Sequence, residues 1–139
     1  MNLEEAIIFA LSAHTGQKDK AGKPYIFHPF AVMSKMETEE EQMVAVLHDV
    51  VEDTHFKVED LRILVHNDTV VDAVDAISRR KGEIYKDYIR RVKTNPLATK
   101  VKLADLEHNM SPDRVNALPE NERGVVNRYK WAKEELTRK

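Results

Sequence analysis

Apolar positions recur every three or four residues along most of the chain, which is the period of an amphipathic helix. The first such run follows Asn2, a suitable N-cap with Glu5 as its reciprocal acid, and Gly16 is a natural stop. The pattern therefore predicts a helix over about 3–14. No segment shows the strict alternation of a half-buried strand.

The same reasoning predicts seven further helices, several of them marked by a proline or by acids in the first turn. One short helix begins at His28, and the other six lie over about 39–52, 58–65, 69–79, 85–94, 96–110 and 119–137. Residues 15–27 hold two of the four glycines, so we expect a loop there. The sequence predicts an all-α fold, with residues 1–139 forming one domain, a compact bundle of about seven or eight helices.

The composition is that of an ordinary soluble globular protein, with 42% hydrophobic and 33% charged residues. A net charge of -2 argues against a general nucleic-acid binder, so any anion site must be a local cluster of Lys and Arg. The absence of cysteine excludes disulfides, thiolate zinc sites and cysteine nucleophiles. Acids follow Met1 where a signal peptide has bases, and no apolar stretch approaches the ~20 residues that span a bilayer. We expect a cytoplasmic protein without a membrane partner.

The stretch from His48 to Asp53 concentrates a histidine and three carboxylates. On the predicted 39–52 helix, at about 100° per residue, His48, Asp49, Glu52 and Asp53 fall on one arc, and apolar residues fall on the opposite one. A metal site would have this arrangement. The solvated face of a surface helix has it too, so the stretch alone leaves both interpretations open.

A hard divalent metal needs several nitrogen and oxygen ligands, with positions left for water and substrate. His28, His48, Asp49 and Asp105, which come from three predicted helices, would supply four. Asp105 and Asn109 lie four residues apart among small apolar residues, so they either cap a neighbouring group or point into a polar pocket. These distant partners favour the metal site.

Four blocks of the sequence, in this order, resemble those of a known family. They are Ala13-His14-Thr15-Gly16-Gln17, Lys23-Pro24-Tyr25-Ile26-Phe27-His28-Pro29, His48-Asp49-Val50-Val51-Glu52-Asp53-Thr54, and Lys102-Leu103-Ala104-Asp105 with His108-Asn109-Met110. Over nearly its whole length the chain resembles the HD-domain hydrolases, specifically the hydrolase domain of the RelA/SpoT type and its small stand-alone relatives of the Mesh1 type.

The resemblance implies a metal-dependent phosphohydrolase. Enzymes of this family use Mn²⁺ to remove pyrophosphate from the 3′ position of guanosine tetra- and pentaphosphate. The roles it implies are metal ligation by His28, His48, Asp49 and Asp105, positioning and deprotonation of the attacking water by Glu52 and Asp53, and substrate contact by Asn109. Lys20 and Lys23, in the predicted loop, would hold the phosphates or remain solvated.

Two departures from the family pattern leave the substrate open. Asp19-Lys20 stands where the family usually has Arg-Lys, whose arginine packs against guanine, and Asp105-Leu106-Glu107-His108-Asn109 stands where the family tends to have Asp-Arg-Leu-His-Asn. An acid in the loop removes the stacking group and adds repulsion near a polyphosphate. The alternatives are another small substrate, such as a nucleoside monophosphate or NADPH, and an inactive nucleotide-binding module. The oligomeric state stays open.

The remaining histidines and tyrosines receive structural roles at this stage. We expect His14 and His108 to be polar groups with satisfied hydrogen bonds near the core, and His55 and His66 to lie on the surface. Two tyrosines at helical spacing, Tyr85 and Tyr88, are more typical of packing than of base stacking.

Overall fold

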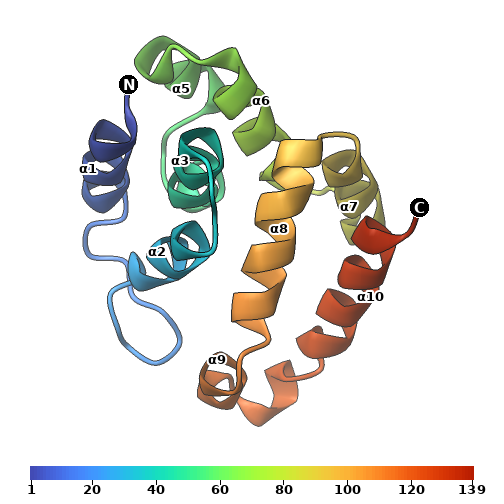
Figure 1. Cartoon of the computed structure of the whole chain (residues 1–139). Coiled ribbons are helices and arrows are strands. Elements are labelled where there is room, and N and C mark those ends of the chain that lie inside the picture. The colour runs from blue at the N-terminus through green and yellow to red at the C-terminus, as the bar shows by residue number, and fades with distance from the viewer.

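The computed structural model describes all of residues 1–139. All its regular elements are helices, apart from an isolated bridge between Lys18 and Pro24. Ten α-helices and one 3₁₀ turn follow one another along the chain (Figure 1). They are α1 (Leu3–Ala13), α2 (Phe27–Ser34), α3 (Glu39–Leu47), α4 (Val50–Asp53), α5 (Val58–Val65), α6 (Asp68–Ile77), α7 (Tyr85–Lys93), α8 (Pro96–Asn109), α9 (Pro112–Ala117), η1 (Glu120–Glu122) and α10 (Val125–Thr137). The expected all-α class is confirmed.

Two differences account for the larger number of helices. The predicted 39–52 helix is interrupted at His48 and Asp49, which separate α3 from α4. The segment after Pro112, where the sequence analysis places no helix, forms the short helix α9, and Pro112 occupies a first-turn position, where its missing N–H costs no hydrogen bond. The final helix begins at Val125 and not near residue 119.

Local capping explains why several helices begin where the sequence indicates. The Asn2 side chain accepts the Glu5 N–H, and the Glu5 carboxylate accepts the Asn2 N–H, which completes a capping box for α1. Thr38 caps α3 in the same way. Asn95 accepts the Ala98 N–H at 2.9 Å and directly precedes Pro96, so α8 starts as predicted.

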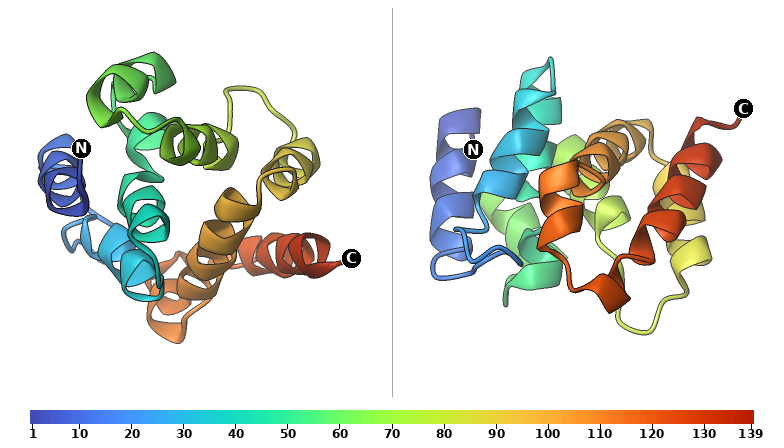
Figure 2. Two further views of the ribbon diagram at one scale, coloured as in Figure 1. Left: turned by 45° about the horizontal axis from the view of Figure 1, so that its top comes forward. Right: turned by 90° about the horizontal axis from the view of Figure 1, so that it is seen from below.

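The core forms around α3 and α8. Helix α3 contacts α1, α2, α6 and α8, while α8 contacts α2, α3, α6, α7, α9 and α10. Figure 2 shows the consequence, with the N-terminal helices on one side of α8 and α7 and α10 on the other. Residues 43–47 are each at most 2% exposed, so α3 is surrounded by protein. The polar residues that follow it therefore enter the interior of the molecule.

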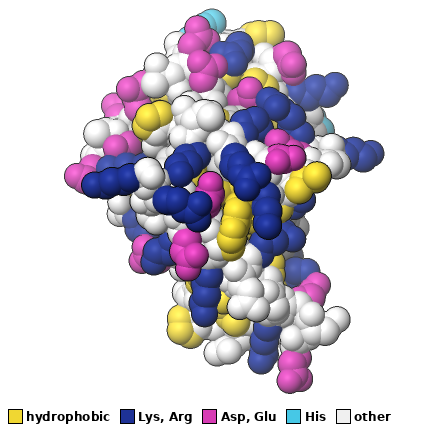
Figure 3. Space-filling model, turned by 90° about the vertical axis from the view of Figure 1, so that its right-hand side faces the viewer, with side chains coloured by type: hydrophobic (Ala, Val, Ile, Leu, Met, Phe, Trp, Pro, Cys, Tyr) yellow, Lys and Arg dark blue, Asp and Glu magenta, His cyan; other side chains and the backbone are white.

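Charge is unevenly distributed over the surface. Lys and Arg side chains gather on the face that carries α7 and α10 (Figure 3). Lys86, Arg90 and Arg128 are among the exposed cations of these two helices. This local excess of positive charge exists although the whole chain has a net charge of -2. None of the helices is both long and apolar enough to cross a membrane.

Candidate metal centre

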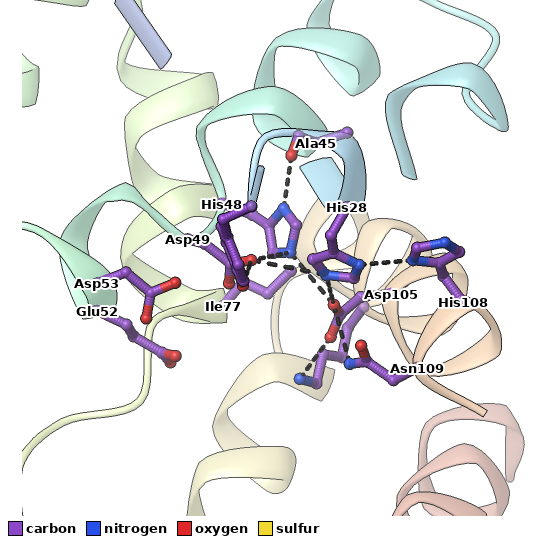
Figure 4. A network of polar contacts seen from close by, with 12 residues as sticks. His28, Ala45, His48, Asp49, Glu52, Asp53, Ile77, Asp105, His108 and Asn109 are labelled. Atoms are coloured by element: carbon purple, nitrogen blue, oxygen red, sulfur yellow. Dashed lines mark hydrogen bonds and ion pairs between the residues drawn. The ribbon is translucent and has the colours of Figure 1, made fainter. Parts of the chain in front are cut away.

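Four side chains from three parts of the chain meet in the interior. His28 comes from the first turn of α2, His48 and Asp49 from the break between α3 and α4, and Asp105 from α8. One nitrogen or oxygen atom of each lies within 4.8 Å of the corresponding atoms of the others. Figure 4 shows the four side chains pointing toward one another. We call these four residues the His/Asp cluster.

The cluster is shielded from solvent. His28, His48 and Asp105 are 2%, 3% and 4% exposed, and the Asp49 side chain is 13% exposed. The interpretation of His48 and Asp49 as part of a solvated helix face is therefore wrong. Asp105 points inward, as its apolar neighbours on α8 indicate. Four ionisable groups this deeply buried are costly unless they pair with one another or hold a cation.

Both histidines direct Nε2 into the cluster. His28 Nε2 lies 2.7 Å from Asp105 Oδ1, and His48 Nε2 lies 3.2 Å from Asp49 Oδ2 and 3.3 Å from Asp105 Oδ1. His48 Nδ1 faces the Ala45 carbonyl oxygen at 2.5 Å, so it must carry a proton to donate there. Burial lowers the pKa of His48, but Asp49 and Asp105 more than offset this and raise it, so a cation bound inside the cluster would displace the Nε2 proton and use the lone pair there. This is the orientation that metal-binding histidines usually have.

His108 supports His28 from the other side. The two Nδ1 atoms are 2.7 Å apart, and the rings stack at 4.9 Å between centroids (Figure 4). Burial, with the nearby His28, lowers the pKa of His108 to about 4, so His108 is neutral near neutral pH and its Nδ1 can accept a hydrogen bond from the His28 Nδ1–H. His28 then donates through Nδ1 and keeps Nε2 free. His108 therefore has the hydrogen bond that the sequence analysis expects, and its partner is a residue of the His/Asp cluster.

Tyr25 orients Asp49. Its hydroxyl donates to Asp49 Oδ2 at 2.6 Å, and burial together with the neighbouring Asp49 and Asp53 raises the Tyr25 pKa. Burial raises the pKa of Asp49, but the adjacent His48 outweighs this and lowers it to about 2. Asp49 is therefore a carboxylate that accepts a hydrogen bond from a permanently protonated phenol.

Lys102 supplies a buried positive charge. Its Nζ lies 2.8 Å from Asp105 Oδ2 and 5.3 Å from the centroid of the Tyr88 ring. Burial lowers the pKa of Lys102, but Asp105 and Tyr88 more than offset this, so Lys102 stays protonated. Because Lys102 pairs with Asp105 Oδ2, the other carboxylate oxygen, Oδ1, faces both histidines.

The acid pair lies beside the cluster and does not belong to it. Glu52 and Asp53, on α4, line a cleft that also reaches His28, Asp49 and Asp105 of the cluster. In Figure 4 the two acids stand together to one side of the four converging residues. Glu52 Oε1 accepts the backbone N–H of Arg79, and Asp53 Oδ2 accepts the Gln17 side-chain amide at 3.4 Å. Burial, reinforced by the Asp49 charge, raises the pKa of both acids despite these hydrogen bonds.

The cleft contains cations as well as carboxylates. Its lining includes Arg79, Lys102, Arg114 and Arg128. Arg79 and Arg128 both lie over the ring of Tyr85, with guanidinium carbons 5.4 Å and 4.3 Å from its centroid. The cleft can therefore accommodate an anion with several charges, next to the cluster and the acid pair.

The predicted substrate-binding residues lie at different places. Asn109 reaches the cleft, where its Nδ2 donates to Asp105 Oδ1 at 3.3 Å. Lys20 lines an adjoining recess, and Lys23 lines another recess next to His28 and His108. Sequence reasoning did not identify Arg114 and Arg128, because no local pattern distinguishes them from other surface arginines.

The other structural expectations have mixed outcomes. His55 and His66 are exposed, as predicted. His14 is buried and its Nδ1 pairs with Gln17 Oε1 at 2.8 Å, but its Nε2 has no partner, so the expectation that it is fully satisfied is wrong. Tyr88 is 2% exposed and packs in the core, and both Tyr85 and Tyr88 line the cleft.

Comparisons with known proteins place this geometry in context. No family model matches the chain. The chain is 35% identical over 120 residues to a GTP pyrophosphokinase of Streptomyces coelicolor and 32% identical over 123 residues to the bifunctional (p)ppGpp synthase/hydrolase SpoT of Escherichia coli K12, covering 78% of this chain in each case. It is 29% identical over 161 residues to a probable guanosine-3′,5′-bis(diphosphate) 3′-pyrophosphohydrolase of Synechocystis, covering 95% of this chain.

The chain spans only 14%, 17% and 21% of the length of these three relatives. A solved structure described as a metazoan orthologue of SpoT that hydrolyses ppGpp has the same fold. It superposes with a TM-score of 0.82 at 23% identity, covering 98% of this chain and 85% of the other. From its sequence relatives and its fold, we conclude that the chain belongs to the RelA/SpoT type of HD-domain proteins.

Proposed function

We propose that this protein is a metal-dependent pyrophosphohydrolase that removes the 3′-pyrophosphate of guanosine-3′,5′-bis(diphosphate), and that residues 1–139 act as one hydrolase domain. The observation that carries the proposal is the convergence of two imidazole nitrogens and two carboxylates beside a separate acid pair. The names of the sequence relatives support the choice of substrate.

The donor set of the His/Asp cluster suits a hard or borderline divalent cation, since it offers two nitrogens and two oxygens and no sulfur. His28, His48, Asp49 and Asp105 would hold it, and we propose Mn²⁺ as the metal. The hydrogen bonds that both histidines make through Nδ1 support their role as ligands through Nε2. A bound divalent cation would lower the pKa of a bound water and offset phosphate charge.

The chain's own residues would then complete the reaction. Glu52 and Asp53 position the attacking water and accept its proton, a role favoured by their raised pKa values. The water oxygen bonds to the phosphorus that is attached to the ribose 3′ oxygen. The bond from that phosphorus to the 3′ oxygen breaks, the 3′ oxygen takes up a proton, and the products are pyrophosphate and GDP.

The cations of the cleft would bind the phosphates. Arg79 and Arg128 both lie next to Tyr85, and each can offer several N–H donors to phosphate oxygens. Asn109 would contact the nucleotide from the side of α8. Lys20 and Lys23 would contribute positive charge from the loop over 15–27, in the two recesses described above.

The test is a panel of nucleotides assayed with and without Mn²⁺, with product analysis. We expect pyrophosphate and GDP from guanosine-3′,5′-bis(diphosphate), and loss of activity after chelation. Glu52→Gln and Asp53→Asn should each lower kcat about 10²- to 10⁴-fold, while Mn²⁺ binding persists. Glu59→Gln, an exposed acid of α5, is the matched control.

Other outcomes would separate the alternatives. Release of phosphate from NADPH or a nucleoside monophosphate, with no pyrophosphate from the guanosine compound, would identify a different HD phosphohydrolase. Nucleotide binding without any product would identify an inactive binding module. Full activity of both acid variants would refute the mechanism.

A further inference from the structure

The reaction proposed above does not use one buried histidine. His14 follows the last residue of α1 and is 3% exposed, and its ring packs against the Tyr25 ring with 5.3 Å between centroids. Its Nδ1 lies 2.8 Å from Gln17 Oε1. Because an amide oxygen only accepts hydrogen bonds, Nδ1 must carry a proton and act as the donor. Since Nε2 has no partner, the single hydrogen bond of the His14 ring is directed at Gln17.

The turn after α1 holds the backbone of Gln17 in place. Gly16, at φ +83°, takes the left-handed conformation that favours glycine and reverses the direction of the chain there. The Gln17 N–H donates to the His14 carbonyl oxygen at 3.0 Å, and the Gln17 carbonyl oxygen accepts the Tyr25 N–H at 2.9 Å. The backbone of Gln17 is thus bound on both sides, and the partners of its amide set the direction of the side chain.

The Gln17 amide connects His14 to the acid pair. Its Nε2 donates to Asp53 Oδ2 at 3.4 Å, a long contact of the kind that often shortens when a substrate binds. Only one orientation of the amide suits both neighbours. If the amide were turned over, its oxygen would face the Asp53 carboxylate, acceptor against acceptor. By donating to Oε1, His14 therefore keeps the amide nitrogen toward Asp53.

Asp53 depends on a side chain for its hydrogen bond, whereas Glu52 does not. Glu52 accepts the backbone N–H of Arg79, a donor that no substitution removes except proline. Burial and the Asp49 charge raise the pKa of Asp53, and the hydrogen bond from Gln17 opposes this rise. The Gln17 donor thus favours the charged carboxylate, which is the form that can accept a proton from water.

We propose that His14 and Gln17 are positioning residues, which hold the Asp53 carboxylate toward the attacking water through two successive hydrogen bonds. Asp53 lines the cleft, whereas His14 and Gln17 do not. The two residues therefore act on a bound nucleotide through the groups that they hold and not by touching it. The proposal rests on the proposed function, in which Asp53 accepts the proton of the water.

The first test is the turnover of guanosine-3′,5′-bis(diphosphate) by Gln17→Met, whose side chain has a similar length but no comparable donor or acceptor. We expect kcat to fall about 10- to 100-fold, with KM and Mn²⁺ affinity nearly unchanged, because only the base loses its orientation. Gln42→Met changes a half-buried glutamine of α3 outside the cleft and should keep the wild-type kcat. An unchanged kcat in Gln17→Met would overturn the proposal. An equally large fall in Mn²⁺ affinity would also overturn it, since the pair would then act through Tyr25 on the metal ligand Asp49.

A double-mutant comparison separates positioning from a general effect on the fold. In the Asp53→Asn background no base remains to be positioned, so adding Gln17→Met should lower kcat no further. Equal losses in both backgrounds would show a merely structural effect and overturn the proposal. His14→Phe should behave like Gln17→Met, and His14→Asn should recover part of kcat because its amide nitrogen can replace Nδ1 as the donor. Equal kcat values of the two His14 variants would contradict the role of His14.

NMR of the protein without substrate separates this proposal from the proposed function. The imidazole nitrogen shifts should show a proton on His14 Nδ1, and Asp53→Asn should move the side-chain amide resonances of Gln17 but not those of Gln42. A His14 Nδ1 without a proton, or Gln17 resonances that stay in place in Asp53→Asn, would overturn the positioning role even in an active enzyme. Both contacts in a protein that hydrolyses no nucleotide would overturn only the proposed function.

Discussion

The loop between α6 and α7 is held by one ion pair whose contribution can be measured. Arg91 donates to both carboxylate oxygens of Glu83, at 3.0 Å and 2.8 Å. The same guanidinium donates to the carbonyl oxygens of Asp75, Ala76 and Ser78 at the end of α6, where the last carbonyl groups lack the full set of helical partners. Neutralising Glu83 by Glu83→Gln should therefore destabilise the fold.

The magnitude follows from the Glu83 pKa. The Arg91 hydrogen bonds, opposed by partial burial, lower this pKa from 4.5 to about 2. At 1.36 kcal/mol per pKa unit the difference corresponds to about 3.4 kcal/mol. Since the Glu83 and Arg91 side chains are 15% and 21% exposed, solvent screening reduces the expected loss to about 1.5–2 kcal/mol.

The pH dependence gives a second check. A carboxyl whose pKa is lowered by folding stabilises the protein above its unfolded pKa and loses that contribution as the pH falls toward its folded pKa. The stability gap between wild type and Glu83→Gln should therefore be full at pH 7 and shrink between about pH 4.5 and pH 2.

Urea unfolding followed by circular dichroism measures this gap at each pH. Glu134→Gln, an exposed acid of α10 without an ion pair, is the control and should change stability little. A gap that stays constant from pH 7 down to pH 3, or a gap no larger than that of the control, would refute the reasoning. The result also bears on the cleft, because the Arg79 side chain donates to the Glu83 carbonyl oxygen in the same loop.

Two further predictions concern the support of the His/Asp cluster, and calorimetric titration with Mn²⁺ checks both. His108→Phe keeps a ring against His28 but removes the nitrogen acceptor, so Mn²⁺ affinity should fall about 10- to 100-fold. His108→Asn offers an acceptor again and should restore part of this affinity. Equal affinities of the two variants would contradict the role of His108. Tyr25→Phe removes the donor to Asp49 at 2.6 Å and should also weaken Mn²⁺ binding, with a stability loss of about 1 kcal/mol. Affinity equal to that of the wild type would show that Asp49 needs no such support.

Most helix starts could be predicted because their signals are local. Asn2 with Glu5, and Asn95 with Pro96, act within one turn of chain, so the sequence contains all the partners that these caps use. The break after Leu47 carries no proline or glycine. There His48 turns to the Ala45 carbonyl oxygen and to Asp105, and the latter contact depends on how α8 packs.

The site, too, could be predicted from the sequence only in part. The sequence blocks that resemble the family pointed to His28, His48, Asp49 and Asp105, and the structure brings these four together. Arg114 could not be located from the sequence. Its place depends on α9, a helix that two nearby prolines made look like a loop, and on the fold that brings α9 near the loop after α1.

The interruption at His48 and Asp49 also has a consequence for how this sequence can vary in length. Helix α4 has only four residues, and the insertion of one residue before it would turn Glu52 and Asp53 by about 100° around the helix axis. The buried histidine could stay in place while both acids faced away from the cleft. The spacing from Asp49 to Glu52 is thus as strict a requirement as residue identity, and a relative with an extra residue there would keep the His/Asp cluster yet lose its acid pair.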